Sequence, residues 1–365
     1  MDNRWRGVNN VLLVRLDNLG DVLLTTPAIH AIKGAAPHVK ITLLASPVGA
    51  QVRHLNPDID DVIVYEAPWM DGKGVFSHNS ERELAVIHLL KEKEFDGAII
   101  FTSYHQSSLP AAYLCYLADI PLRHAASVDG SGSLLTTRHR HPPLMMHEVE
   151  RGLDLVAGIG FIPGEKDLVL VTGPEDEARA TRLLERIGIR PDRPLIVIHP
   201  GCSLQARTYP WGQYARVADL LIERLGCQIL FTGGADEVDL VRKIRHWTKL
   251  DTASIAGQTD LGSLAAIIAR ANLVITNNTG PMHVAAAMKT PVIALFALTN
   301  PPEQWGPWMV PHRILNKPTP CAYCYSRTCV VGHDCLRLVS PEEVVAASED
   351  LLCESAIDTA GAGCR

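Results

Sequence analysis

Residues 11–33 read VLLVRLDNLGDVLLTTPAIHAIK, a stretch that joins a short apolar run, a polar turn and a helical pattern. The run at 11–16 predicts a strand, Gly20 permits a close turn, and the spacing over about 20–33 predicts a helix. The same unit recurs along the chain. Further strands are predicted at 41–44, 61–64, 98–101, 195–199, 228–232, 273–276 and 292–296.

Helical patterns follow these strands in both halves of the chain. They are predicted near 47–54, 80–93, 108–117, 147–158, 175–187, 211–225, 235–247, 260–270 and 281–288. Alternating strands and helices indicate parallel sheets with helices on both faces. We therefore predict an α/β protein made of two Rossmann-like domains that face a central cleft. In such sheets, ligands bind at the carboxyl ends of the strands.

The domain limits follow from the places where this alternation weakens. Residues 121–145 are rich in Gly, Ser, Pro and His and predict loops, and His139, His141 and His147 are interpreted as part of a polar loop. A capping box at Ser340 to Glu343 predicts the start of the last helix. We predict an N-terminal domain at 1–170, a linker region at 171–194, a C-terminal domain at 195–350 and a tail at 351–365.

Composition excludes several classes of protein. Apolar residues make up 47% of the 365 residues and charged residues 20%, so the chain is not disordered as a whole. The net charge of -6 argues against nucleic acid as a partner. No apolar run approaches a membrane span, and the polar N-terminus does not look like a signal peptide, so a cytoplasmic protein is expected. The nine cysteines are then expected to be thiols or metal ligands.

The first strand leads into Asp17-Asn18-Leu19-Gly20-Asp21. Asp21 falls at the start of a helix, where it could cap the helix or act as a general base. This segment alone favours capping. Asp17 precedes the glycine turn and is expected not to face the cleft. The segment has no Gly-x-Gly-x-x-Gly fingerprint, which weakens a nicotinamide oxidoreductase as an interpretation.

Two strand ends in the second half carry residues suited to a nucleotide. Gly201 and Ser203 follow the strand at 195–199 and offer backbone N–H groups, and Arg207 offers a fork of donors to phosphate. In isolation Arg207 could equally be a solvated surface charge. After the next strand, Gly233 and Gly234 let a ligand approach the backbone. Asp236 could then accept hydrogen bonds from ribose hydroxyls, or simply cap the helix.

The strongest segment is TNNTGPMH at 276–283. Asn278, Thr279 and Gly280 lie between a strand and a helix that begins near Pro281, so the backbone amides form an anion site at a helix N-terminus. His283 lies about one turn into the helix, where its ring can face the same ligand. A lone histidine is usually structural, but three polar strand ends at one edge favour a diphosphate-nucleotide site.

Four cysteines form a separate constellation within fifteen positions, namely Cys321, Cys324, Cys329 and Cys335. This spacing suits a closed tetrahedral site for zinc or iron, with a structural role. The alternative is a loop of free thiols. A nucleic-acid-binding knuckle would have similar spacing, but the acidic balance of the chain argues against it.

Taken together, residues 10–350 resemble glycosyltransferase family 9, the ADP-heptose:lipopolysaccharide heptosyltransferases. The segments that carry the resemblance are RLDNLGDVLLTTP at 15–27, His199-Pro200-Gly201, Arg207–Trp211, Gly233-Gly234 and NTGPMHVAAA at 278–287. The resemblance implies a GT-B fold, with the acceptor bound by the N-terminal half and the sugar nucleotide by the C-terminal half. It also implies inverting transfer of a heptose from ADP-heptose without a catalytic metal or other cofactor.

The resemblance also assigns roles to single residues. Asp21 is implied to be the general base, Arg207 a phosphate contact that assists catalysis, and Asp236 a ribose contact. The residues expected to bind the nucleotide sugar are Gly20, Gly201, Ser203, Arg207, Gly233, Gly234, Asp236, Asn278, Thr279, Gly280 and His283. The expected partners are an ADP-sugar and a lipid-linked or glycan acceptor, such as the lipopolysaccharide core, at the inner membrane surface.

Two departures from the family pattern bear on the donor. Asn278 stands where the family often has Asp, and Arg207 where it often has Lys. Both are compatible with phosphate binding, but they leave the sugar open. The alternatives are a GT-B enzyme that uses another nucleotide sugar or a protein acceptor, and a non-catalytic protein that binds nucleotide sugars.

Overall fold

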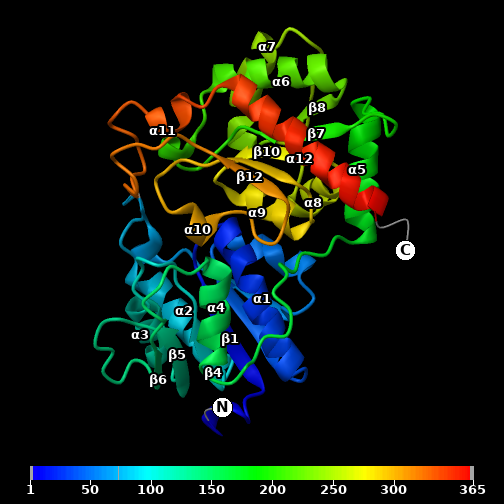
Figure 1. Cartoon of the computed structure of the whole chain (residues 1–365). Coiled ribbons are helices and arrows are strands. Elements are labelled where there is room, and N and C mark those ends of the chain that lie inside the picture. The colour runs from blue at the N-terminus through cyan, green and yellow to red at the C-terminus, as the bar shows by residue number, and fades with distance from the viewer. Residues whose placement is uncertain (1–2, 73, 362–365) are drawn as a thin grey trace. The chain divides into compact units, whose positions relative to one another are not determined.

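The computed structural model describes residues 3–72 and 74–361, and the chain divides into two compact units, Met1–Val171 and Thr172–Arg365 (Figure 1). Within the described residues, each unit contains one parallel sheet of six strands. The α/β class that the strand and helix alternation predicts is confirmed. No helix in the described part of the chain combines the length and the apolar character needed to cross a membrane.

The first sheet has the strand order that is usual in Rossmann folds. Its strands, in spatial order, are β3 (Asp61–Val64), β2 (Lys40–Ala45), β1 (Asn10–Arg15), β4 (Gly97–Ile100), β5 (Leu122–Ala126) and β6 (Thr137–His139). Strands β1 and β2 are almost wholly buried, as is typical of parallel strands covered on both faces. The direction of strand order reverses between β1 and β4, which is where ligands bind in such sheets.

Helices cover both faces of this sheet. The helical segments are η1 (Asn3–Trp5), α1 (Leu19–Ala35), η2 (Gly49–Leu55), η3 (Pro68–Met70), α2 (Ser80–Glu92), α3 (Leu109–Leu117) and α4 (Glu148–Ala157). Helices α1 and α4 pack against each other, and Figure 1 shows them side by side. One core cluster joins α2 and α3 to alternate residues of the strands, including Leu12, Val14, Leu90 and Ala112.

The second sheet repeats the same topology. In spatial order its strands are β9 (Ala253–Ser254), β8 (Gln228–Phe231), β7 (Leu195–His199), β10 (Leu273–Asn277), β11 (Val292–Leu295) and β12 (His312–Leu315). The reversal lies between β7 and β10. The helical segments are α5 (Pro174–Arg186), η4 (Gln205–Arg207), α6 (Trp211–Leu225), η5 (Ala235–Glu237), α7 (Val238–Trp247), α8 (Leu261–Ala269), α9 (Gly280–Ala287), α10 (Pro302–Trp305), α11 (Asp334–Arg337) and α12 (Pro341–Gly361).

Some sequence expectations differ from the structure. The region 121–145, expected to be loops, contains strand β5 and the edge strand β6, which pair in register over His124–Ala126 and Thr137–His139. Their backbone pairing does not need the β-branched apolar run on which the sequence prediction relied. The segment at 47–54, predicted as a helix, is a 3-10 helix.

Helix α5 confirms the helix predicted near 175–187, within the region 171–194. It packs against α8 with an ion pair of 2.6 Å between Arg179 and Asp260. The last helix begins at the predicted capping box, where the Glu343 amide donates to Ser340 Oγ at 3.2 Å. It continues beyond residue 350 because Leu351 is buried in the core.

Candidate active site

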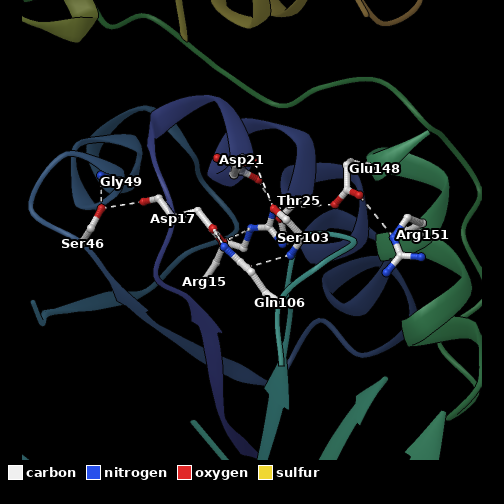
Figure 2. A network of polar contacts seen from close by, with 10 residues as sticks. All are labelled: Arg15, Asp17, Asp21, Thr25, Ser46, Gly49, Ser103, Gln106, Glu148 and Arg151. Carbon is white, nitrogen blue, oxygen red and sulfur yellow. Dashed lines mark hydrogen bonds and ion pairs between the residues drawn. The ribbon is translucent and has the colours of Figure 1, made fainter. Parts of the chain in front are cut away.

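Arg15 is a buried guanidinium at the carboxyl end of β1, beside the reversal point of the first sheet. Its Nε lies 3.1 Å from Asp17 Oδ2, and its Nη2 lies 3.2 Å from Asp21 Oδ1 and 3.0 Å from Ser103 Oγ (Figure 2). Burial alone would lower the pKa of Arg15, but the carboxylates of Asp17, Asp21 and Glu148 raise it above its ordinary value. Arg15 therefore stays charged and holds the surrounding carboxylates in place.

Asp21 is the most accessible carboxylate of this network. It lies in the first turn of α1, three residues after the N-cap Asn18, and its side chain is 20% exposed, against 7% for Asp17 and 3% for Glu148. Arg15 and the hydroxyl of Ser103, at 3.4 Å, contact the same oxygen, Oδ1. The position of Asp21 is thus held from one side while the carboxylate remains reachable by a substrate hydroxyl.

Asp17 is part of the same network. Besides Arg15, its carboxylate accepts a hydrogen bond from the side-chain amide of Gln106. Asp17 also lines a cavity of about 280 Å³ together with Trp69, His105 and Gln106. Substitution of Asp17 would therefore disturb Arg15. A variant at Asp17 is thus unsuitable as a control in experiments that test Asp21.

Glu148 is a member of the network that the sequence did not indicate. It is the first residue of α4, and its carboxylate lies 3.8 Å from Arg15 Nη2 and 3.3 Å from Arg151 Nε (Figure 2). Burial raises the pKa of Glu148 to about 7, although both arginines act in the opposite direction. Glu148 can therefore take up or release a proton near neutral pH within contact distance of the group that positions Asp21.

Glu148→Gln is expected to change how stability depends on pH. The folded-state pKa of about 7 lies above the ordinary 4.5, so the folded protein binds the extra proton more tightly. This contribution to stability is complete below pH 4.5 and is lost as the pH rises through about 7. Gln cannot ionise, so the variant does not lose this stability. Its melting temperature should therefore rise relative to that of the parent as the pH increases from 4.5 to about 7.

The measurement is a series of thermal melts across this pH range, read as the difference between variant and parent. Glu150→Gln, on the same helix α4, is the matched control and should track the parent. A constant difference between Glu148→Gln and the parent across the range would contradict the pKa assigned to Glu148.

In the second unit, a chain of side chains joins two of the predicted site segments. Arg207 Nε donates to Thr299 Oγ1 at 3.1 Å, Thr299 Oγ1 donates to Asn300 Oδ1 at 2.9 Å, and Asn278 Nδ2 donates to the same Asn300 oxygen at 3.0 Å. Arg207 is half-buried, and Asn278 is buried. The structure therefore brings Arg207 and Asn278 together, through two residues that follow β11.

Asn277 fixes the loop between β7 and α6 against the end of β10. Its Nδ2 donates to the carbonyl oxygens of Pro200, at 2.8 Å, and Gly201, at 3.2 Å. Its Oδ1 accepts from the Tyr209 amide and from the Tyr214 hydroxyl, both at 3.0 Å. Because Asn277 is fully buried, these bonds set the position of the loop rather than contact a ligand.

The N-terminus of α9 lies at the same sheet edge. Thr279 is its N-cap residue with extended backbone, Gly280 opens the helix, and Pro281 occupies the first turn. The first amides of a helix carry positive potential and favour anions. His283 lies one turn further on and is buried. This arrangement has the donor groups that a diphosphate requires.

Gly201 and Gly233 both face Glu237 rather than Asp236. A Cβ atom at Gly201 would overlap the Glu237 carboxylate, so a larger residue there would require that carboxylate to move. The same carboxylate accepts from the Gly234 amide at 2.7 Å and lies 3.4 Å from His199 Nε2. Asp236 is exposed. Glu237 is therefore a second acid at this strand end, which the sequence analysis did not consider.

The four cysteines of the constellation lie in one segment but are not gathered into a tetrahedron. Cys335 is buried, Cys329 is half-buried, and Cys321 and Cys324 are exposed. Burial raises the pKa of Cys335, and the other three thiols act in the same direction, which shows that they are near neighbours. Among the described residues, however, these thiols do not form a group that is already placed to hold a metal ion.

The cysteine segment supports the loop that carries Arg207. The amide of Ala206 donates to the carbonyl of Arg327 at 3.0 Å, and His333 Nε2 lies 2.7 Å from the carbonyl oxygen of Ala206. The amide of Tyr325 donates to the carbonyl of Thr299 at 2.7 Å. A substitution in this segment should therefore shift Ala206, which precedes Arg207 in the chain, and Thr299, which accepts a hydrogen bond from the Arg207 guanidinium.

Two signals could have revealed the residues that the sequence analysis missed. Arg15 interrupts an otherwise apolar buried strand, and arginine is almost never buried without a partner. Thr299 and Asn300 follow the fourth predicted strand of the second half, at the edge where the other polar strand ends converge. Glu148 carries no such signal, because only the packing of α4 on α1 brings it to Arg15.

Known proteins are similar to this chain in both fold and sequence. The model of the family described as "Glycosyltransferase family 9 (heptosyltransferase)" matches residues 84–334. Lipopolysaccharide heptosyltransferase 3 of Escherichia coli K12 is 28% identical over 346 residues, which cover 92% of this chain and 96% of that protein.

Two solved structures are similar over nearly the whole chain. The glycosyl transferase family 9 protein of Veillonella parvula has a TM-score of 0.79 at 25% identity, covering 95% of this chain and 98% of that one. The ADP-heptose lps heptosyltransferase II of E. coli has a TM-score of 0.74 at 21% identity, covering 95% and 99%.

Each of the two α/β units thus has a parallel sheet, with polar residues where the strand order reverses. Together with the similar structures, this defines a glycosyltransferase with the fold of the GT-B heptosyltransferases. The chain belongs to glycosyltransferase family 9, the heptosyltransferases, and the proteins similar to it include lipopolysaccharide heptosyltransferases. The family resemblance stated from the sequence is confirmed.

Proposed function

We propose that this protein transfers a heptose, or a related sugar, from an ADP-sugar to the lipopolysaccharide core or a related glycan, with inversion at the anomeric carbon. The observation that carries the mechanism is the Arg15 network, which positions one partly exposed carboxylate, Asp21. The names of the similar proteins, which include heptosyltransferases of lipopolysaccharide and one that uses ADP-heptose, support the donor and the acceptor.

In the proposed reaction, an acceptor hydroxyl oxygen attacks the anomeric carbon from the side opposite to the nucleotide. Asp21 takes the hydroxyl proton as the new C–O bond forms. The bond between the anomeric carbon and the β-phosphate oxygen breaks, and ADP leaves with its electron pair. A single displacement of this kind inverts the configuration.

The leaving diphosphate gains negative charge, and in this proposal residues of the second unit stabilise it. Arg207 supplies a cation, and the amides at Thr279 and Gly280 supply donors at the N-terminus of α9. His283 and Asn278 complete the diphosphate side in this proposal. The nucleotide-binding site would be lined by Gly201, Ser203, Gly233 and Gly234. Asp236 or Glu237 would accept hydrogen bonds from the ribose hydroxyls. Gly20 lies in the first turn of α1, next to Asp21.

The donor is tested by thermal unfolding with a panel of ADP-, UDP- and GDP-sugars. A ligand that binds only the folded protein stabilises it by about 2.7 kcal/mol at a concentration about 100 times Kd. ADP-heptose is expected to give the largest shift, and ADP alone a smaller one. A larger shift with a UDP- or GDP-sugar would favour the alternative GT-B enzyme, and binding without transfer to any glycan acceptor would favour a non-catalytic protein.

We also propose that the acceptor is lipid-linked and is met at the cytoplasmic face of the inner membrane. The lipopolysaccharide acceptors named for the relatives support this location. Incubation with core-truncated lipopolysaccharide in detergent, followed by mass spectrometry, tests the acceptor. A mass increase of one heptose is expected.

We further propose that Cys321, Cys324, Cys329 and Cys335 hold one structural zinc or iron ion. Their sequence spacing and the nearness of the other thiols to Cys335 support this proposal. The sulfurs would have to move together, since tetrahedral zinc thiolates place them about 3.8 Å apart. Elemental analysis of untagged protein should find about one ion per chain. Four titratable thiols with little metal would favour a loop of free cysteines.

A further inference from the structure

His139 and His141 direct their rings at one carboxylate oxygen in the first unit, outside the Arg15 network. His139 Nε2 lies 2.6 Å from Asp154 Oδ2, and His141 Nδ1 lies 2.7 Å from the same oxygen. His139 ends the edge strand β6, His141 follows two residues later, and Asp154 lies on α4. Side chains two residues apart on an extended segment share a face, which explains why both rings reach one partner.

The charge states of these groups suit a cation. Burial lowers the pKa of His141, with Arg151 and His139 acting in the same direction and Asp154 against it. Burial alone would raise the pKa of Asp154, but hydrogen bonds with the two rings lower it. Both shifts have the direction that favours metal binding, since a metal is bound by a carboxylate and a neutral imidazole.

The cluster is also open enough to take up an ion. The side chains of His139, His141 and Asp154 are 14%, 12% and 29% exposed, and their three ligand atoms lie within 4.8 Å of one another. The positive charge of Arg151 acts on His141, and Arg151 Nε lies 3.3 Å from the carboxylate of Glu148. This carboxylate partly compensates the repulsion between Arg151 and an incoming cation.

We propose that His139, His141 and Asp154 form a binding site for a zinc-like divalent cation, which would tie the edge strand β6 to helix α4. Two imidazoles and one carboxylate are a ligand set that zinc and similar borderline metals prefer. Ligand bonds of about 2.0–2.2 Å place tetrahedral ligands about 3.3 Å apart, so the side chains must separate slightly. The remaining coordination positions are filled by water.

Binding requires each ring to present a lone pair toward the ion. A neutral histidine does this by carrying its proton on the other ring nitrogen, Nδ1 in His139 and Nε2 in His141. The carboxylate of Asp154 then contacts the ion in place of two ring N–H groups. Because α4 begins with Glu148, an ion at this site would also stiffen the helix that contacts Arg15.

The probe is Co²⁺, titrated into the full-length protein in which Cys321 and Cys324 are replaced by Ser. This background weakens the cysteine segment as a competing site, and cobalt bound by nitrogen and oxygen shows d–d absorption without thiolate charge transfer. We expect one saturable site per chain with this spectrum. Asp154→Asn, which keeps the size and can still accept a hydrogen bond, should weaken binding on the order of 10-fold or more.

His139→Ala and His141→Ala should weaken binding at least as much. His88→Ala, which removes an exposed histidine on α2, is the matched control and should leave binding unchanged. Thermal melts without metal establish that each variant is folded. Failure to bind Co²⁺ at millimolar concentration, or equal affinity in Asp154→Asn and its background, would show that the three residues only hydrogen-bond to one another.

Discussion

Asp21→Asn is expected to lower turnover by on the order of 100-fold or more, the scale of general-base catalysis. Asn keeps the size of the side chain but cannot accept the proton of an acceptor hydroxyl. Helix α1 has its N-cap at Asn18, and Arg15 retains Asp17 and Glu148 as partners, so the fold should survive. The rate is measured with saturating donor and acceptor, beside a thermal melt and a donor-binding titration.

The matched control is Glu81→Gln, which removes an exposed acid from the first turn of another helix, α2, in the same unit. It should leave turnover unchanged. If Asp21 only held Arg15 in place, Asp21→Asn would lower the melting temperature and leave kcat near that of the parent. Full transferase rate in Asp21→Asn would refute the proposed base and leave the nucleotide site standing.

Arg207→Ala is expected to weaken ADP binding on the order of 10- to 100-fold, because it removes a charge-assisted hydrogen bond to phosphate worth about 1.5–3 kcal/mol. The guanidinium is held by Thr299, so it is placed before the ligand arrives. Turnover should fall further than binding, since negative charge on the diphosphate grows as ADP leaves. Isothermal titration with ADP measures the first effect, and steady-state kinetics the second.

Two further variants serve as controls for this result. Arg207→Lys keeps the positive charge and should retain most of the affinity, although it loses the planar fork of donors. Arg224→Ala removes an arginine from the last turn of α6, the helix that follows the Arg207 segment, and should bind ADP like the parent. Equal affinity in Arg207→Ala and Arg224→Ala would mean that Arg207 is a surface charge without a role in the donor site.

Much of the fold could be predicted because the local spacing of apolar residues indicates strands and helices. The eight predicted strands with apolar runs, such as 11–16 and 195–199, appear where they were expected. All but β3 are largely buried, and a parallel strand covered on both faces needs continuous apolar residues. The strands β5, β6, β9 and β12 were not predicted. The edge strands β6, β9 and β12 are only partly buried, and the interior strand β5 buries Arg123 and His124, so none of the four carries a long apolar run.

The donor-site candidates were predicted for a similar reason. Gly201, Gly233 and Thr279 lie directly after strands, and the ends of parallel strands meet at one sheet edge whatever the rest of the chain does. Sequence could not tell Asp236 from Glu237, because one helical step decides which acid turns toward Gly201. Nor could it show that Thr299 and Asn300 connect Arg207 to Asn278.

By itself, then, the sequence determined the α/β class, the family and the strand ends that carry Asp21 and Arg207, because these depend on residues close together in the chain. Only the tertiary structure decided the surroundings of Asp21. Arg15, Ser103 and Glu148 are separated by up to 133 positions, and they meet because β1 pairs with β4 while α4 packs on α1. A buried charge must find its partners in space, and no local pattern records which distant residues will supply them.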